Sequence, residues 1–333
     1  MNYYVYNTQK ANGVKVIVQN LIKGFERRGI TCQEVKSLAN CNKNDIVIPF
    51  GVKESMEVYK KGFNPSLALL VDAISLGYKN KIKFYLKRGY IFQYDFLYSI
   101  YGYLRYSQME KNVMAAFKNV MLVSQVDIDY LKESKASKHC NFMYVPNGAY
   151  INVETDQHVD SDDLRVGILS SWVTKQTCSE SAWFIKDYFV RFAKTHPKIK
   201  LYIAGRGGLI HNFSGLNNVI VLGAVDSLSE FFSKIDVFVS ANPKGCGILN
   251  RVLDTVAYKV PVIGIPGSFT GFPNSDKVFY RFDDYKSFET LLEHLSSNPH
   301  ELQEIAQNAY EYVLANNNWE TIYDKFIDDI LNL

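Results

Sequence analysis

The chain has 333 residues, of which 47% are hydrophobic and 21% are charged. This is the composition of a globular protein, and it excludes a disordered chain or a coiled coil. At roughly 150 residues per domain, the length predicts two domains, which we place at residues 1–150 and 151–333.

The small net charge of +3 conceals a large asymmetry between the two halves. Residues 1–150 carry a net charge of +10 and the remainder a net charge of −7. Halves of opposite charge predict domains that meet different partners.

Several classes of protein are excluded by what the sequence lacks. No uncharged apolar run reaches the roughly 18 residues that a membrane-spanning helix needs. The first residues hold no basic segment followed by an apolar core, so we expect no signal peptide. The five cysteines form no C-x-x-C pair and no metal-ligand spacing. They predict a cytoplasmic location and no metal site.

The first half alternates apolar runs with helical periodicity. Residues 3–6 predict a strand, and apolar residues at helical spacing then lead to Gly29, which predicts the end of a helix. The continuous apolar runs at 46–50, 67–71 and 120–123 are typical of buried parallel strands. Strands that alternate with helices predict an α/β fold.

The second half begins the same alternation again, after a polar, acidic link predicted at 150–163. The expected strands are 165–169, 200–204, 219–222, 237–240 and 260–264. The expected helices are 181–195, 228–233, 249–258, 291–315 and 319–331. The sequence shows no internal repeat beyond this alternation.

The segment most indicative of function is K-G-C-G-I-L-N-R-V-L-D at 244–254, which follows a strand and opens a helix. Its glycines let backbone N–H groups approach a ligand, and a helix N-terminus favours a phosphate. Arg251 could reach the same anion, and Asp254 lies three residues later on the same helical face, where it could accept hydrogen bonds from sugar hydroxyls. A plain strand–helix turn explains this segment equally well when it is taken alone.

This segment resembles the donor-site motif of glycosyltransferases with the two-domain B-type fold, the family-four-like glycosyl transferases group 1. At two positions where many relatives carry glutamates, this chain has Cys246 and Asp254. Other similar segments follow in the family's order over nearly the whole chain. They are Asn12-Gly13, the D-A-I-S-L stretch from Asp72, Glu110-Lys111, Val123-Ser124, Pro146-Asn147-Gly148, Trp172, Trp183-Phe184 and Gly223-Ala224-Val225.

The resemblance implies an α/β fold of two Rossmann-like domains that face a central cleft. It implies an N-terminal acceptor domain at 1–150, a C-terminal donor domain at 151–333, a last helix that packs back on the first domain, and transfer with retention. A nucleotide-diphosphate sugar is then the donor, and no metal or other cofactor is expected. The expected donor-binding residues are Gly13, Lys175, Arg206, Val225, Lys244, Gly245, Gly247, Ile248, Leu249, Asn250, Arg251 and Asp254.

Three residues are predicted to carry the chemistry. Arg206 and Arg251 would stabilise the departing diphosphate, together with the N–H groups of Gly247 and Ile248. Asp72 follows an apolar strand at its carboxyl end, where it would contact the acceptor hydroxyl as a base. A helix N-cap is an equal alternative for Asp72.

Residues 78–106 are unusual, with eleven aromatic side chains, six basic ones and a single acid. This mixture indicates peripheral attachment to an anionic membrane surface, such as the inner face of the cell membrane. An ordinary aromatic core helix with a solvated basic face is the alternative. Nucleic-acid binding would explain the basic half but not the glycine-rich half, so we expect no nucleic-acid partner.

The function that the sequence predicts is transfer of one sugar to a glycan or polyprenyl-linked acceptor. Bacterial surface polysaccharide synthesis, such as capsule or O-antigen, is the expected setting. The alternative is a catalytically silent domain of the same fold, which would serve as a scaffold or a glycan-binding partner of another transferase.

Overall fold

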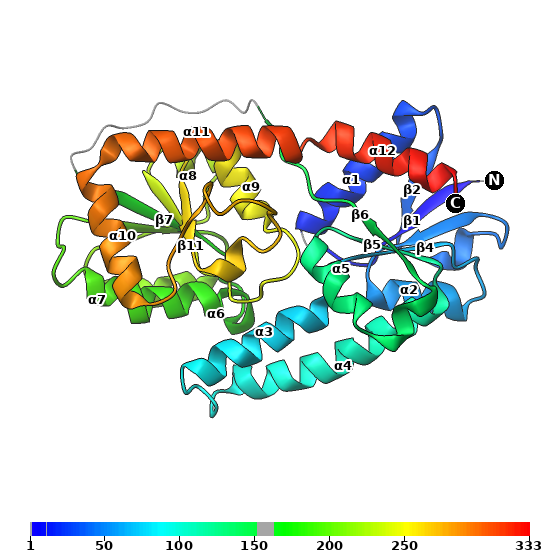
Figure 1. Cartoon of the computed structure of the whole chain (residues 1–333), viewed down its shortest axis with the longest axis horizontal. Coiled ribbons are helices and arrows are strands. Elements are labelled where there is room, and N and C mark those ends of the chain that lie inside the picture. Colours follow the sequence, from blue (N-terminus) through cyan, green and yellow to red (C-terminus); the bar gives the residue numbers. More distant parts are fainter. Residues whose placement is uncertain (1, 11, 152–162) are drawn as a thin grey trace.

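The computed structural model describes residues 2–10, 12–151 and 163–333. The link predicted at 150–163 lies almost entirely outside these described residues. The chain forms two α/β lobes side by side (Figure 1).

The first lobe contains two parallel three-stranded sheets, in the orders β2-β1-β3 and β4-β5-β6. A parallel bridge between Phe50 and Leu69 joins them edge to edge. Strands β3, β4 and β5 are largely buried, which is why they read as apolar runs, whereas β2 and β6 expose part of their residues. The strands are β1 (Tyr3–Tyr6), β2 (Cys32–Val35), β3 (Ile46–Pro49), β4 (Leu67–Val71), β5 (Asn119–Leu122) and β6 (Asn141–Tyr144).

The second lobe is built on one parallel sheet in the order β12-β11-β10-β7-β8-β9. Its strand order reverses between β7 and β10, and open α/β sheets bind ligands at such a point, beyond the carboxyl ends of the strands. The strands are β7 (Arg165–Leu169), β8 (Lys200–Ala204), β9 (Val219–Gly223), β10 (Val237–Ser240), β11 (Val262–Gly264) and β12 (Tyr280–Arg281).

Helices cover the faces of the sheets in both lobes (Figure 1). In the first lobe they are α1 (Asn12–Arg27), α2 (Val52–Lys60), α3 (Ile74–Lys87), α4 (Tyr94–Ala116) and α5 (Gln125–Lys132). In the second part of the chain they are α6 (Lys175–Phe184), α7 (Val190–Phe192), α8 (Leu228–Phe232), α9 (Asn250–Ala257), α10 (Tyr285–Ser297), α11 (Pro299–Asn316) and α12 (Trp319–Leu331).

Two helix predictions are wrong in their bounds. The helix expected at 181–195 begins at Lys175, because Thr174 and Thr177 form a capping box there, and it passes through a π-helical turn before α7. The helix expected at 291–315 is two helices. Pro299 offers no N–H and disfavours helical geometry in the residue before it, and Asn298 accordingly has φ −132° and ψ 65°.

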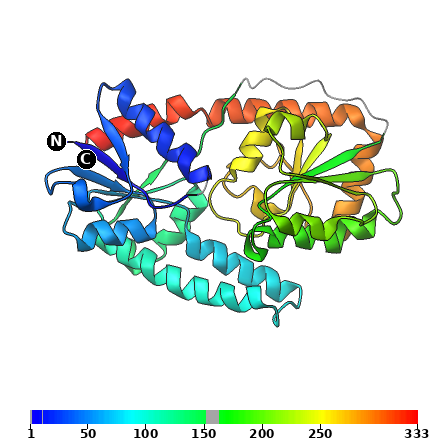
Figure 2. The same ribbon diagram turned by 180° about the vertical axis from the view of Figure 1, so that it is seen from behind.

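The last two helices return the chain to the first lobe. The line of α11 and α12 passes from one lobe to the other along one side of the molecule (Figures 1 and 2). There α12 packs on α1 so closely that a Cβ at Gly24 would lie 2.9 Å from the side chain of Ile327. Arg28 adds an ion pair of 2.8 Å with Asp328.

Helices α3 and α4 form a hairpin on the opposite side of the molecule from α11 and α12 (Figure 2). The hairpin belongs to the first lobe but contacts α6 of the second. The Phe84 ring meets the Trp183 ring edge to face, with centroids 4.9 Å apart. The guanidinium of Arg88 lies 3.9 Å from the Phe84 centroid and 4.4 Å from that of Trp183. The hairpin therefore forms a second bridge between the lobes.

Candidate functional site

A strained turn presents Asp72 at the carboxyl end of β4. The turn closes with a hydrogen bond of 2.9 Å from the Asp72 N–H to the Leu70 carbonyl, and Val71 between them has φ +70°. A β-branched residue avoids this region, and residues in such sparsely populated backbone regions cost about 1–3 kcal/mol each. Strain of this kind gathers at functional sites, which supports the prediction that Asp72 is functional rather than a helix cap. Ala73, not Asp72, is the N-cap of α3.

The glycine loop after β10 meets Asp72 from the other lobe. Gly245 and Gly247 have φ of +54° and +64°, a region that glycine adopts without strain. A Cβ at Gly247 would lie 2.1 Å from Asp72 Oδ1. Only a glycine therefore lets this loop approach the carboxylate so closely.

A second carboxylate, Asp127 of α5, holds the same loop. The Gly247 N–H donates to Asp127 Oδ2 at 2.8 Å. The sequence predicts this N–H as a donor to the diphosphate, but in this structure it is already paired, which corrects that expectation. The other oxygen, Asp127 Oδ1, is buried without a hydrogen-bond partner among the described residues.

Three carboxyl groups of the first lobe gather beside this loop, and each binds its proton more tightly than usual. Burial raises the pKa of Asp127 to about 8, and the neighbouring charge of Asp72 adds to the effect. Burial also raises the pKa of Glu110 to about 7 and that of Asp72 to about 6. Clusters of perturbed groups in a cleft mark functional sites.

Cys246 lies between the two glycines of this loop. Burial, with the charges of Asp72 and Asp127, raises the pKa of its thiol well above the usual value. The protonated thiol is a poor nucleophile, so Cys246 does not act as one.

Helix α9 begins beyond the glycine loop and carries several predicted donor residues. Arg251 donates from Nη1 to the Leu169 carbonyl at 3.3 Å, which places it at the end of β7, beside the point where the strand order reverses. Burial lowers the pKa of Arg251. Burial raises the pKa of Asp254 to about 6.

Asn250 joins the lobes. Its Oδ1 accepts a hydrogen bond of 2.8 Å from Asn147 Nδ2, and a Cβ at Gly13 would lie 3.0 Å from its Nδ2. These contacts bring the P-N-G segment, the start of α1 and the start of α9 together. Asn250 and Gly13 thus lie at the junction of the lobes.

Two predicted cations are exposed. Arg206 follows β8, between Gly205 (φ +128°) and Gly207 (φ +123°). Within the described part of the chain, neither the Arg206 nor the Lys175 side chain makes a hydrogen bond or an ion pair, so both are free to meet an anion.

The Lys244 side chain forms an ion pair with Glu180. Its ammonium lies 3.8 Å from Glu180 of α6, which also pairs with Lys81 of α3 at 3.0 Å. Burial opposes ionisation of Glu180, but the two lysines hold its pKa below the usual value. Lys244 is therefore less available to a donor phosphate than the sequence predicts.

The remaining predicted donor residues are apolar or lack a side chain. Ile248 is buried in the hydrophobic core, while Leu249, the N-cap of α9, and Val225 pack against that core. Gly245 lies against α3, since its Cβ would be 3.0 Å from Asn80 Nδ2.

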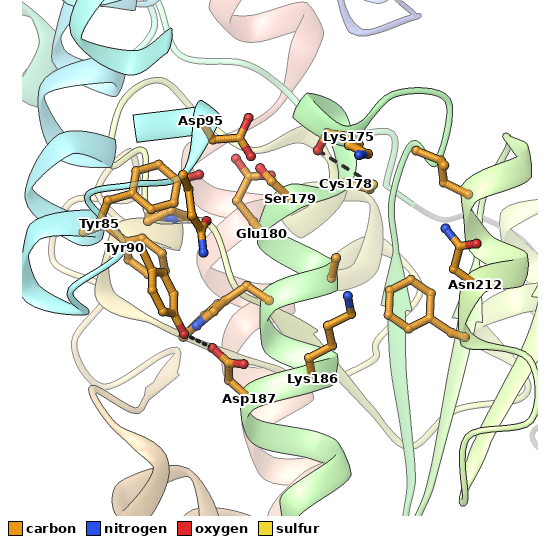
Figure 3. Close-up of a pocket in the computed structure, with 17 residues that line it drawn as sticks. Tyr85, Tyr90, Asp95, Lys175, Cys178, Ser179, Glu180, Lys186, Asp187 and Asn212 are labelled. Carbon is orange, nitrogen blue, oxygen red and sulfur yellow. Dashed lines mark hydrogen bonds between the residues drawn. The ribbon is translucent and has the colours of Figure 1, made fainter. Parts of the chain in front are cut away.

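Two cavities open between the α3–α4 hairpin and the second lobe. One, of about 350 Å3, has Asp72, Lys81, Lys244 and Cys246 in its wall, with Tyr78 and Tyr98 from the hairpin. The other, of about 400 Å3, lies between the hairpin and α6 and includes Lys175 (Figure 3). Tyr90 and Asp187, joined by a hydrogen bond, lie at one end of it (Figure 3).

The described residues hold no side-chain cluster of the kind that binds metal ions. No group of three or more His, Cys, Asp or Glu side chains is placed to hold a metal ion in the described ranges. No helix among the same residues is long and apolar enough to cross a membrane.

Sequence reasoning did not single out Asp127 and Glu180 as site residues, and it named Glu110 only within a motif. Asp127 is the acidic residue of the V-S-x-x-D stretch and Glu110 opens the E-K pair before it, so the motif itself contained their signal. Glu180 lies in no such motif; the docking of α6 on the hairpin gives it Lys81, and the loop after β10 in its own lobe gives it Lys244.

A model of a known protein family matches part of the second half of the chain. Residues 169–296 match the family model described as glycosyl transferases group 1. No curated protein sequence matches the chain.

Solved structures match the whole chain in fold. Sucrose-phosphate synthase from Thermosynechococcus elongatus is 14% identical, with a TM-score of 0.72 over 100% of this chain and 98% of that chain. Anabaena Alr3699/HepE in complex with UDP is 12% identical, with a TM-score of 0.70 over 100% of both chains. A mutant of S. aureus TarM, in complex with UDP and other ligands, is 14% identical, with a TM-score of 0.62 over 92% of this chain and 57% of that chain. The predicted fold of two Rossmann-like domains is confirmed.

Proposed function

We propose that this chain, whose residues 169–296 match the glycosyl transferases group 1 model, is a glycosyltransferase that moves a sugar from a nucleotide-diphosphate sugar to a glycan or lipid-linked acceptor. The observation that carries this proposal is the meeting of Asp72 with the glycine loop across the cleft. The second lobe supplies the donor site and the first the acceptor site.

The donor lies at the reversal of strand order in the second lobe. Arg251 is near the end of β7, beside that point, and Arg206 follows β8, the next strand of the sheet, so both guanidinium groups lie on the β7 side of the reversal. They stabilise the diphosphate as negative charge develops on it. HepE and TarM were each solved with UDP, which supports a uridine nucleotide as the donor group.

Asp72 acts on the acceptor. As the bond between the anomeric carbon and the phosphate oxygen breaks, the nucleotide diphosphate leaves with the electron pair. The acceptor hydroxyl bonds to the carbon, and its proton passes to Asp72. A pKa of about 6 leaves most of Asp72 ionised at neutral pH and ready to accept that proton. Retention at the anomeric carbon is proposed from the family resemblance, and product anomers seen by NMR would test it.

The test of this function is nucleotide release from a panel of nucleotide sugars with glycan acceptors. We expect release with one donor, and Asp72→Asn should lower it by about 10²- to 10⁴-fold while nucleotide binding persists. Full turnover of Asp72→Asn would refute the catalytic role. We expect EDTA to leave the rate unchanged, since arginine side chains supply the positive charge.

A catalytically silent scaffold is the second candidate. It is favoured by Cys246 in place of an acid and by the pairing of the Gly247 N–H with Asp127. Nucleotide binding without release from any donor and acceptor pair would support this candidate over the transferase.

We further propose that the α3–α4 hairpin docks on an anionic membrane that carries a polyprenyl-linked acceptor for bacterial surface polysaccharide. Large apolar side chains are exposed on it, among them Phe92 (94% exposed), Leu104 (64%) and Leu97 (61%). Basic residues of the same hairpin would meet anionic headgroups. Flotation with anionic vesicles, lost in Phe92→Ser, would support docking, and equal flotation with neutral vesicles would remove its electrostatic part.

A further inference from the structure

Four tyrosines form a line of aromatic contacts, here called the tyrosine ladder, along the α3–α4 hairpin. Tyr94 stacks on Tyr98 with centroids 6.0 Å apart, and Tyr98 meets Tyr78 at 6.1 Å edge to face. Tyr78 stacks in turn on Tyr106 at 5.7 Å. Gly102 makes the room, because a Cβ there would lie 2.6 Å from the Tyr78 ring.

The ladder runs from the surface into the candidate site. Tyr94 is 67% exposed and Tyr98 is 39% exposed. Tyr98 and Tyr78 also form part of the wall of the 350 Å3 cavity that contains Asp72. A ligand that lay along these rings would therefore enter the cavity beside the proposed base.

The charges in this cavity are largely compensated. Lys81 and Lys244 share the carboxylate of Glu180, and Asp95 adds a negative charge to the wall. The cavity therefore does not demand an anionic ligand. Ser99, Gln176 and Thr177 complete the wall with uncharged hydrogen-bonding groups.

Aromatic faces beside uncharged donors and acceptors suit a carbohydrate, which presents apolar C–H faces and many hydroxyls. The volume of about 350 Å3 lies within the range of small-molecule sites, roughly 300–1,000 Å3. We infer that the tyrosine ladder binds a neutral saccharide portion of the acceptor, with sugar rings over Tyr94 and Tyr98 and the reacting sugar beside Tyr78 and Asp72. This inference rests on the proposed function.

The experiment uses the full chain with UDP present and an array of neutral and uronic-acid oligosaccharides as probes. We expect binding to neutral members, and Tyr94→Ala and Tyr98→Ala should each weaken it about 3- to 10-fold, the range that corresponds to one aromatic contact. Tyr101→Ala is the matched control, because Tyr101 is 57% exposed on the same helix but lies outside the ladder. Its binding should match that of the unaltered chain.

Kinetic measurements distinguish a failure of the ladder as an acceptor site from a failure of the proposed function on which it rests. With an array member that serves as acceptor, Tyr98→Ala should raise the acceptor KM and leave the donor KM and the UDP-induced thermal shift unchanged. A raised donor KM, a preference for uronic members, unaltered saccharide binding by both variants, or no array binding by the unaltered chain would each overturn the ladder as an acceptor site. Failure of the proposed function would instead appear as no nucleotide release in the unaltered chain.

Discussion

The substitution Asp127→Asn tests the carboxyl cluster at the cleft. Asp127 has a pKa of about 8 in the folded chain, against roughly 3.9 in an unfolded one. A carboxyl group with a raised pKa binds its proton more tightly when folded, so its unfavourable contribution to folding grows as the pH rises from about 4 to about 8 and is constant above that. An asparagine at this position carries no charge, so its contribution to the free energy of unfolding does not change with pH.

The magnitude follows from the pKa difference. One pKa unit corresponds to about 1.4 kcal/mol, so a rise of about four units places an upper bound of about 6 kcal/mol on the gain at pH 9. The asparagine amide still offers an oxygen to the Gly247 N–H. Its NH2 group would occupy the place of Oδ1, which has no partner among the described residues, at a cost of about 1–3 kcal/mol. A net gain of about 3–5 kcal/mol is therefore expected at pH 9, and a net loss of about 1–3 kcal/mol at pH 4, where only the cost of the unpartnered NH2 group remains.

Urea unfolding from pH 4 to pH 9 measures this difference. Relative to the unaltered chain, the free energy of unfolding of Asp127→Asn should be lower at pH 4 and should increase with pH until it is higher at pH 9. Asp129→Asn is the control, since Asp129 is exposed on the same helix and should leave the profile unchanged. Parallel profiles for Asp127→Asn and the unaltered chain would refute the reasoning.

Three further changes test the junction and the donor site. Gly247→Ala places a Cβ 2.1 Å from Asp72 Oδ1 at φ +64°, so the lobes should separate and transfer should be lost; an unchanged radius of gyration in X-ray scattering would contradict this. Arg206→Ala should weaken nucleotide binding by about tenfold, or about 1.4 kcal/mol, at an unchanged Tm, and calorimetric titration that gives the same Kd would exclude its role. Asn250→Ala removes the hydrogen bond to Asn147 and should lower the free energy of unfolding by about 1 kcal/mol in urea titrations, whereas no loss would mean that the bond contributes nothing.

Local patterns predicted most of the strands of this protein. The strands expected at 67–71, 165–169, 200–204 and 237–240 agree with β4, β7, β8 and β10 residue for residue. A strand buried on both faces must be apolar throughout, so its bounds are visible in the sequence. The break before Pro299 was equally local, but the long apolar periodicity around it hid the break.

The sequence predicted the roles of the charged residues less well than it predicted the strands. Lys244 was predicted as a phosphate ligand, yet it pairs with Glu180, and the Gly247 N–H donates to Asp127. These partners lie 64 and 120 residues away along the chain. The Gly247–Asp127 contact depends on how the lobes dock, and the Lys244–Glu180 pair depends on how α6 lies beside the loop after β10. No local periodicity in the sequence reports either arrangement.

The opposite net charges of the two halves likewise did not show which charged groups meet in the folded chain. The sequence by itself determined two α/β units, the glycine loop before α9 and a stretch at 78–106 rich in aromatic and basic residues. Only the tertiary structure decided that the hairpin bridges the lobes and that three carboxyl groups of the basic half gather against the glycine loop of the acidic half. The spacing of apolar residues and the backbone freedom of glycine can be read from neighbours in the chain, whereas charge pairing and desolvation depend on neighbours in space.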